Sequence, residues 1–168
     1  MTRRAKERDE RFAAFFDAES EKLRRLGIFL TGDPEEAAEL AQEALARTYR
    51  HWWRVREEDP GPYARRILVN LVRSRHRRAL LERRHPQRVR DSVPSEAWKV
   101  DEWLRVADAL AQLTPVRRAV VVLRFYEDMS QEDIARTLDR PLGTVKSDMH
   151  RALAQLRPLL ENTERQRA

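Results

Sequence analysis

Apolar residues return at intervals of three and four along most of this chain, the spacing that places side chains on one face of an α-helix. The first such segment covers residues 10–30, and its apolar positions are Phe12, Phe15, Phe16, Leu23, Leu26 and Leu30. Only 4 of the 168 residues are Gly, and the abundant Ala, Leu, Arg and Glu favour helices. The sequence therefore predicts an all-α fold.

Proline-containing sequences mark where further helices begin. Residues 33–36 read Asp-Pro-Glu-Glu, which supplies an N-cap acid, a Pro at the first helical position and a Glu at the third. The apolar side of the helix that follows consists of Ala37, Leu40, Ala41, Ala44, Leu45 and Tyr49. The sequence Asp-Pro-Gly-Pro at 59–62 ends that region, and a third helical segment follows it. Thr114-Pro115 repeats the signal of a cap followed by Pro.

The helical pattern weakens between residues 78 and 100, where no apolar period is sustained. We therefore expect two small helical domains, at residues 10–80 and 101–161, joined by a basic linker at 81–100. The pattern leaves open that the third helix continues into this linker as far as Leu81. A chain of 168 residues has room for two such domains.

The second domain, expected to hold four helices, contains the pattern of a helix-turn-helix. Ser130 and Asp133 form a capping box in which Asp replaces the usual Glu or Gln. The short helix after this box points three small or apolar side chains inward: Ile134, Ala135 and Leu138. Residues 139–141 interrupt it, and a longer helix is expected from Leu142 to Leu160.

This longer helix has two different faces at 100° per residue. One is an apolar stripe of Leu142, Val145, Met149, Leu153, Leu156 and Leu160. The other carries small and hydrogen-bonding residues, namely Gly143, Thr144, Ser147, His150, Arg151 and Ala154, with Lys146 at its boundary. Such a face suits close approach to base edges in a DNA major groove. The alternative is a polar face that simply meets water, but such faces usually carry more Glu and Lys.

Positive charge is concentrated in the middle of the chain. The net charge is +6, and residues 65–90 hold ten Arg and one Glu, a local net charge of +9 that leaves 6 − 9 = −3 for the remainder. A basic band on a mildly acidic protein indicates a nucleic-acid-binding surface. The alternative is a solvated, arginine-rich helix and linker.

Catalytic, metal-binding and membrane-inserted classes find no support in the sequence. The chain has no Cys, and its four His are scattered without ligand spacing: His51, His76, His85 and His150. No paired-carboxylate spacing or glycine-rich phosphate loop is present, so we expect neither an enzyme nor a cofactor. No segment approaches the ~20 apolar residues that cross a bilayer. We therefore expect a cytoplasmic protein without membrane insertion.

Two ordered sets of motifs resemble a known family. Residues 33–49 and 63–70 resemble successive helices of the second conserved domain of bacterial sigma factors. Residues 113–118, 126–130 and 143–147 resemble the fourth conserved domain. Together they resemble the small two-domain, extracytoplasmic-function (ECF) type of the sigma-70 family, similar to its actinobacterial sigma-E-like group.

The resemblance implies a role for each part of the chain. Leu40, Gln42 and Glu43 would dock on the β′ clamp helices of core RNA polymerase, and the β flap of polymerase would be a further contact. The segment 54–61 and the helix that holds Asn70, Arg73 and Arg77 would engage the −10 element of promoter DNA. The −35 element would be contacted by Thr144, Lys146, Ser147, His150 and Arg151. The resemblance also allows an anti-sigma factor as a further partner.

Two points in this carry-over are specific to the sequence. Tyr49, Trp52, Trp53 and Tyr63 flank the basic band, and each is a candidate either for stacking on unpaired bases or for the core. Asp148 occupies a place where members of the family often carry Arg. A carboxylate there is expected to repel a nearby phosphate and to weaken or alter −35 recognition.

Two other functions remain as alternatives at this point. A stand-alone helix-turn-helix regulator would bind duplex DNA without polymerase, usually as a dimer, but no segment is left for a dimerisation helix. A protein-binding adaptor would not need the small, polar face on the last helix. The sequence therefore favours a factor that binds both polymerase and promoter.

Overall fold

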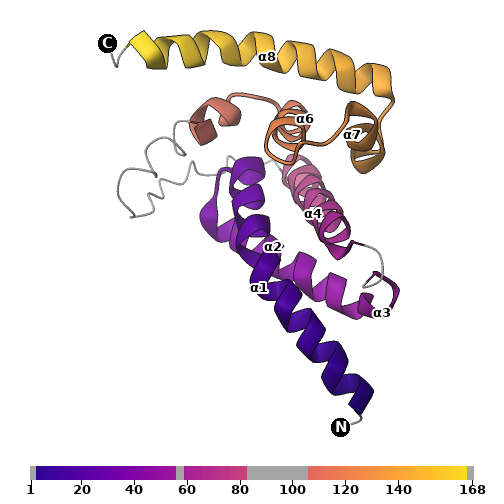
Figure 1. Ribbon diagram of the computed structural model, residues 1–168. Coiled ribbons are helices and arrows are strands. Elements are labelled where there is room, and N and C mark those ends of the chain that lie inside the picture. The colour runs from indigo at the N-terminus through magenta and orange to yellow at the C-terminus, as the bar shows by residue number, and fades with distance from the viewer. Residues whose placement is uncertain (1–2, 56–58, 83–105, 166–168) are drawn as a thin grey trace.

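The structure is a computed structural model that describes residues 3–55, 59–82 and 106–165, and these residues form helices with short connections (Figure 1). The first unit contains α1 (Arg3–Thr31), α2 (Pro34–Arg50), α3 (Trp52–Val55) and α4 (Pro60–Glu82). The second contains a helical segment at residues 106–111, then α6 (Pro115–Phe125), α7 (Gln131–Leu138) and α8 (Leu142–Arg165). No strand occurs in these ranges, which confirms the all-α prediction.

The first unit is built on the packing of α1, α2 and α4 around aliphatic side chains. Leu23, Leu26 and Leu68 are each 0% exposed. Gly27 allows α1 and α2 to approach closely, because a Cβ placed there would lie only 3.0 Å from the Cβ of Ala37. The predicted apolar side of α2 is buried except for Tyr49, which is half-exposed.

The predicted helix starts are confirmed at two caps. Asp33 has an extended backbone, and its carboxylate accepts hydrogen bonds from the backbone N–H groups of Glu35 at 2.9 Å and Glu36 at 3.1 Å. Ser130 caps α7 by accepting from the N–H of Asp133 at 3.0 Å. Each such cap stabilises its helix by about 1 kcal/mol. Thr114 is the N-cap of α6, but its side chain makes no capping hydrogen bond.

The helix-turn-helix follows the predicted order. Ile134, Ala135 and Leu138 of α7 are buried, and the C-cap residue Asp139 that follows α7 has a φ of 51°, the left-handed conformation typical of this position. The N–H groups of Asp139 and Arg140 donate back to carbonyls of α7, which closes the turn before α8 begins.

Several boundaries differ from the prediction. α1 begins at Arg3 rather than near residue 10, and the single turn α3 has too few residues to leave a periodic signal. α4 reaches Glu82, so it continues past Leu81; residues 83–100 of the expected linker lie outside the described ranges. α8 passes Leu160 and includes Pro158 before it ends at Arg165.

The two units pack against each other. Figure 1 shows α8 across one end of the molecule, with α6 and α7 between it and the first unit. The ring centroids of Phe29 on α1 and Tyr126 after α6 lie 4.9 Å apart. The Arg118 guanidinium of α6 donates to the carbonyl of Leu30 at 3.1 Å. Aromatic and hydrogen-bonding contacts thus join the end of α1 to α6.

Candidate nucleic-acid interface

The outward face of α8 presents polar side chains on a rigid support. Val145 is 0% exposed and Met149 is 6% exposed, so these residues anchor the helix on its apolar side. On the opposite side Lys146, Ser147, His150 and Arg151 are exposed, and Thr144 is half-exposed. These are the five residues predicted for the −35 contact, and the structure places all of them on one accessible surface.

The charges on this face are available to an anion. No carboxylate lies within ion-pair distance of Lys146 or Arg151 in the part of the chain that the structure describes. The Ser147 hydroxyl donates to the Thr144 carbonyl at 3.0 Å, which leaves its lone pairs open to a donor. The face can therefore both donate to and accept from base edges and can donate to phosphates.

The repulsion of DNA expected from Asp148 stays a prediction, but Asp148 has cationic partners within the fold. Its side chain is only 13% exposed and lies beside two arginines rather than on the open face. Oδ1 is 3.7 Å from Nε of Arg117 on α6, and Oδ2 is 3.6 Å from Nη1 of Arg140 in the turn before α8. Two cations accompany this one carboxylate, so its charge is compensated within the fold.

Some arginines of the basic band on α4 form ion pairs with carboxylates of the same chain. Arg65 forms ion pairs with Glu127 at 2.8 Å and with Glu19 at 3.2 Å. Arg75 contacts Glu36 and Glu39 on α2. These two arginines of the band therefore hold helices and units together, and binding of an anion by the rest of the band stays a prediction.

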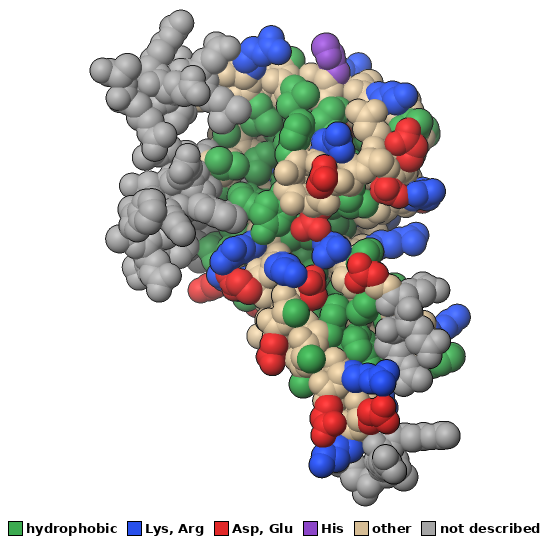
Figure 2. Space-filling view, viewed as in Figure 1, with side chains coloured by type: hydrophobic (Ala, Val, Ile, Leu, Met, Phe, Trp, Pro, Cys, Tyr) green, Lys and Arg blue, Asp and Glu red, His purple; other side chains and the backbone are tan. Residues whose placement is uncertain are grey.

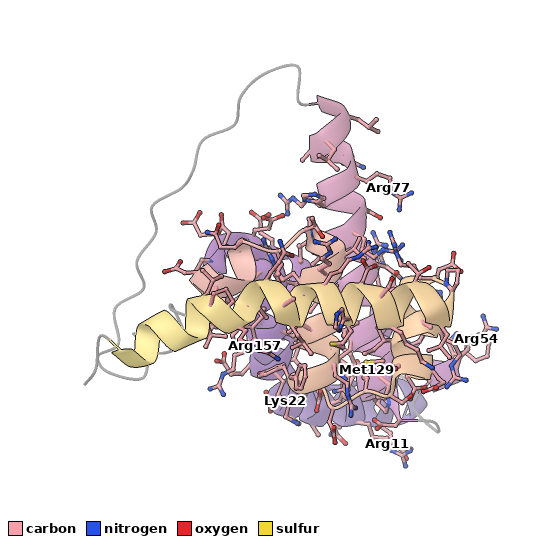
Figure 3. All side chains as sticks on the ribbon, turned by 90° about the horizontal axis from the view of Figure 1, so that it is seen from above. Arg11, Lys22, Arg54, Arg77, Met129 and Arg157 are labelled. Atoms are coloured by element: carbon pink, nitrogen blue, oxygen red, sulfur yellow. The ribbon has the colours of Figure 1, made fainter. Side chains whose placement is uncertain are left out.

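The three α4 residues predicted for the −10 contact differ in exposure. Asn70 and Arg77 are exposed, whereas Arg73 is half-buried. Figure 3 shows Arg77 projecting from the part of α4 that extends beyond α8. Arg73 and Arg77 line a pocket of about 350 Å³ that they share with Arg140 from the second unit. Burial, together with the guanidiniums of Arg140 and Arg77, lowers the pKa of Arg73. Cations from both units thus share one pocket.

The four aromatic candidates separate into core and surface residues. Trp52 is 4% exposed and packs against Phe12 and Phe15, with ring centroids 5.2 Å apart in both pairs. Tyr49 donates to Asp9 at 2.7 Å and accepts from Arg8 at 2.7 Å, which occupies its hydroxyl.

Two of the four remain nearer to the surface. Tyr63 is half-buried, with its ring centroid 6.4 Å from that of His51. Trp53 is 68% exposed, and the Arg54 guanidinium lies 5.4 Å from its ring centroid. Of these four described residues, Trp53 therefore has the most accessible ring.

The α2 residues predicted to contact polymerase also lie in different environments. Gln42 is exposed, and the Glu43 carboxylate pairs with Arg47 at 2.7 Å, a hydrogen bond that lowers the pKa of Glu43. Leu40 is only 6% exposed and belongs to the core, in contrast to the predicted direct contact. Leu40 lies three residues after Ala37 and four residues before Ala44, so all three share the buried stripe of α2.

An apolar groove of about 650 Å³ is the feature that the sequence did not reveal. Its walls come from residues 106–110, α6, α8 and the end of α1, and include Phe125, which is 64% exposed, and Leu153, which is 39% exposed. Of these two, Leu153 was expected on the buried stripe of the last helix. In α8, Ala152 at 0% exposure takes the core position instead, and Leu153 turns toward the groove. Figure 2 shows hydrophobic side chains gathered on the surface beneath α8.

Within residues 3–55, 59–82 and 106–165, no cluster of three or more His, Cys, Asp or Glu has the arrangement to hold a metal ion. In the same ranges no helix combines the length and the apolar character that a membrane span requires.

Comparison with known proteins decides the family. Residues 15–80 match the family model described as Sigma-70 region 2, and residues 103–156 match Sigma-70, region 4. The RNA polymerase sigma-E factor of Streptomyces antibioticus is 40% identical over 141 residues, which cover 80% of this chain and 76% of that protein. The chain belongs to the sigma-70 family.

Other relatives place it in the ECF type. The sigma-E factor of Streptomyces coelicolor is 37% identical over 149 residues, covering 87% of this chain and 84% of its own. The ECF RNA polymerase sigma factor SigL of Mycobacterium tuberculosis is 33% identical over 161 residues, covering 88% of each chain. The chain is therefore an RNA polymerase sigma factor of the ECF type, as the motifs predicted.

Solved structures support the fold of this sigma factor. The sigma factor RpoE of Bartonella quintana, solved in complex with the anti-sigma factor NepR, matches with a TM-score of 0.71 at 23% identity, covering 89% of this chain and 96% of that one. CnrH, solved with the cytosolic domain of CnrY, matches with a TM-score of 0.61 at 22% identity, covering 90% of this chain and 88% of that one. The all-helical architecture is shared with both.

Proposed function

We propose that the exposed face of α8 reads the −35 element of promoters. The observation that carries this proposal is the accessible face formed by Thr144, Lys146, Ser147, His150 and Arg151. Its cations Lys146 and Arg151 have no carboxylate partner in the described ranges. A major groove about 12 Å wide accepts one α-helix, and the small Gly143 and Ala154 on this side permit close approach.

Recognition of the −10 element is assigned to α4 and α3. Asn70 and Arg77 are exposed on α4, and Arg73 joins them at its inner edge. Trp53 and Arg54 on α3 supply a planar ring beside a cation, the pairing that binds an unstacked base and its phosphate. We assign base stacking to Trp53 and not to Trp52, because Trp52 is buried.

Core RNA polymerase is proposed to contact two surfaces. On α2, Gln42 and Glu43 face outward and supply the contact with the β′ clamp helices, while the buried Leu40 holds α2 against its neighbours. The apolar groove beside Phe125 and Leu153 supplies the contact with the β flap. A groove with large exposed apolar side chains suits an amphipathic helix, which would bury them on binding.

On the promoter the two units must separate. The −10 and −35 elements are named from positions 25 base pairs apart, which corresponds to about 85 Å of B-DNA at 3.4 Å per base pair. In the structure, Arg73 of α4 and Arg140 of the turn before α8 line the same pocket. We therefore propose that the packed arrangement is a form of the unbound protein and that polymerase holds the units apart.

The remaining assignments follow from this function. Residues 10–80 and 101–161 act as the two working domains, and the action is non-enzymatic and without a cofactor. The protein acts in the cytoplasm, where bacterial polymerase and promoters are found. An anti-sigma factor is a further proposed partner, supported by the solved sigma factor RpoE of Bartonella quintana, which was crystallised with the anti-sigma factor NepR.

Site-specific crosslinking in the holoenzyme–promoter complex tests these assignments together. A photoreactive amino acid is placed in turn at Ser147, Asn70, Gln42 and Phe125. We expect crosslinks to −35 DNA, −10 DNA, β′ and β, respectively. An exposed position on α1, Ala14, serves as the control that should give none of these products. Crosslinks from Ser147 to protein alone would contradict the role given to α8.

A further inference from the structure

The contacts of Asp148 go beyond what the family assignment explains. The carboxylate lies between α6 and the turn of the helix-turn-helix, 3.7 Å from Nε of Arg117 and 3.6 Å from Nη1 of Arg140. The side chain is 13% exposed, so water screens these ion pairs less than it screens pairs on an open surface. One acidic residue thus connects three elements: α6, the turn and α8.

Arg117 extends the connection along α8. Its Nη1 donates to Oε1 of Gln155 at 2.9 Å. Asp148 and Gln155 are seven residues apart, which places them two helical turns apart on the same side of α8. A single guanidinium on α6 therefore contacts α8 at two points, and two points are enough to fix how α8 is rotated about its axis relative to α6.

The rotation of α8 matters for base reading. Thr144 precedes Asp148 by four residues and Arg151 follows it by three, so both are its neighbours on the helix surface. Adjacent residues on a helix differ by 100° in direction, so a modest rotation carries a side chain away from the base edge that it reads. We call the contacts of Asp148 with Arg117 and Arg140 the tether. It lies beside the base-reading residues of α8, whose direction it fixes.

We propose that Asp148 is a positioning residue for −35 recognition, acting through Arg117 and Arg140 and not by contact with DNA. This inference rests on the proposed role of α8 as the −35 reader. It reverses the sign of the effect expected from the sequence. If the carboxylate repelled phosphates, its removal would strengthen DNA binding; if it positions α8, its removal weakens recognition of the −35 sequence in particular.

The test measures transcription by holoenzyme from a cognate promoter with an intact or a scrambled −35 element. Asp148→Asn keeps the shape of the side chain and removes its charge. We expect it to lower the intact-to-scrambled ratio by about five- to tenfold, of the order of one weakened base contact. Asp148→Glu retains the carboxylate and is expected to recover most of the ratio. Adding Arg140→Gln to Asp148→Asn is expected to cause little further loss, because both changes break the same tether.

Three results would overturn the inference. A rise in transcription or DNA affinity with Asp148→Asn would show that repulsion dominates. Equal loss on both templates, together with a lower Tm, would show a general structural role. An unchanged ratio would show that the tether is irrelevant to recognition. Arg151→Ala separates these failures from failure of the −35 assignment itself: it lowers the ratio if α8 reads the −35 element, and leaves it unchanged if α8 does not.

Discussion

The carboxylate of Glu127, which follows α6, lies 2.8 Å from Nε of Arg65 on α4, and this ion pair joins the two units of the protein. Both side chains are largely buried, with exposures of 11% for Glu127 and 26% for Arg65. Glu19 of α1 contacts the same guanidinium at 3.2 Å. The packed arrangement therefore depends in part on one arginine held by acids from two different units.

Reversing the charge at Glu127 is expected to separate the units. Glu127→Arg places a cation against Arg65, and the repulsion acts in a poorly solvated site. Because the chain has no Cys, cysteines introduced at the exposed Ala14 and Ala154 can carry a donor and an acceptor dye. We expect lower energy transfer in the variant than in the parent. The matched control is Asp17→Arg, the same kind of charge reversal at an exposed site on α1, and a similar drop there would contradict the account.

Trp52 and Trp53 are expected to give opposite results when replaced by Ala. Trp53→Ala should reduce promoter opening, because it removes an exposed ring whose stacking on a base would contribute about 1–3 kcal/mol. Permanganate reactivity of unpaired thymines measures the opening. The Tm of this variant should stay close to that of the parent. Trp52→Ala should instead lower stability by about 3–5 kcal/mol, since it removes a buried ring. Normal promoter opening with Trp53→Ala would exclude a stacking role.

Phe125 is expected to matter for polymerase and not for folding. Its side chain is 64% exposed in the apolar groove, so Phe125→Asp should cost little stability but should weaken binding of core polymerase by about 1–3 kcal/mol. Fluorescence anisotropy with labelled sigma factor measures the affinity. Phe16→Asp on α1 is the control, because Phe16 is also exposed, at 41%, and lies outside the groove. Equal losses in the two variants would argue against a specific contact.

The cap of α7 is expected to depend on pH. Hydrogen bonds from Ser130 and then Arg136 lower the pKa of Asp133 below its ordinary value of 3.8. A carboxyl whose pKa is lower in the folded than in the unfolded state stabilises the fold above the ordinary value, and this contribution is lost as the pH falls through the lowered value. Parent protein should therefore have a higher Tm than Asp133→Asn at neutral pH, and the difference should shrink below pH 3.8. A difference that is constant with pH would contradict this prediction.

The predictable parts of this structure are those set by local sequence. Asp33 and Ser130 cap their helices because side-chain oxygens reach N–H groups only two or three residues away. The polar face of α8 follows from the helical period, since Val145 and Met149 fix which side is buried. Those features need no knowledge of the rest of the chain.

The parts that were not predicted depend on contacts between distant segments. Asp148 is compensated by Arg117, which lies 31 residues earlier and on another helix. Leu153 was expected in the core, but the buried residues of α8 centre on the side that holds Ala152, so Leu153 lies at the edge of the buried stripe and lines the groove. Leu40 was assigned to a partner surface by resemblance, although its own apolar stripe indicates burial.

Run-off transcription with purified core RNA polymerase measures whether this chain directs polymerase to a promoter. Core polymerase alone should give no specific transcript from a cognate promoter, and adding this chain should produce one defined start site. The chain alone should bind the same duplex weakly, because polymerase is needed to separate and present the two units. Tight, specific duplex binding by the chain alone, with no polymerase-dependent start site, would contradict the role of a sigma factor and would favour a stand-alone helix-turn-helix regulator.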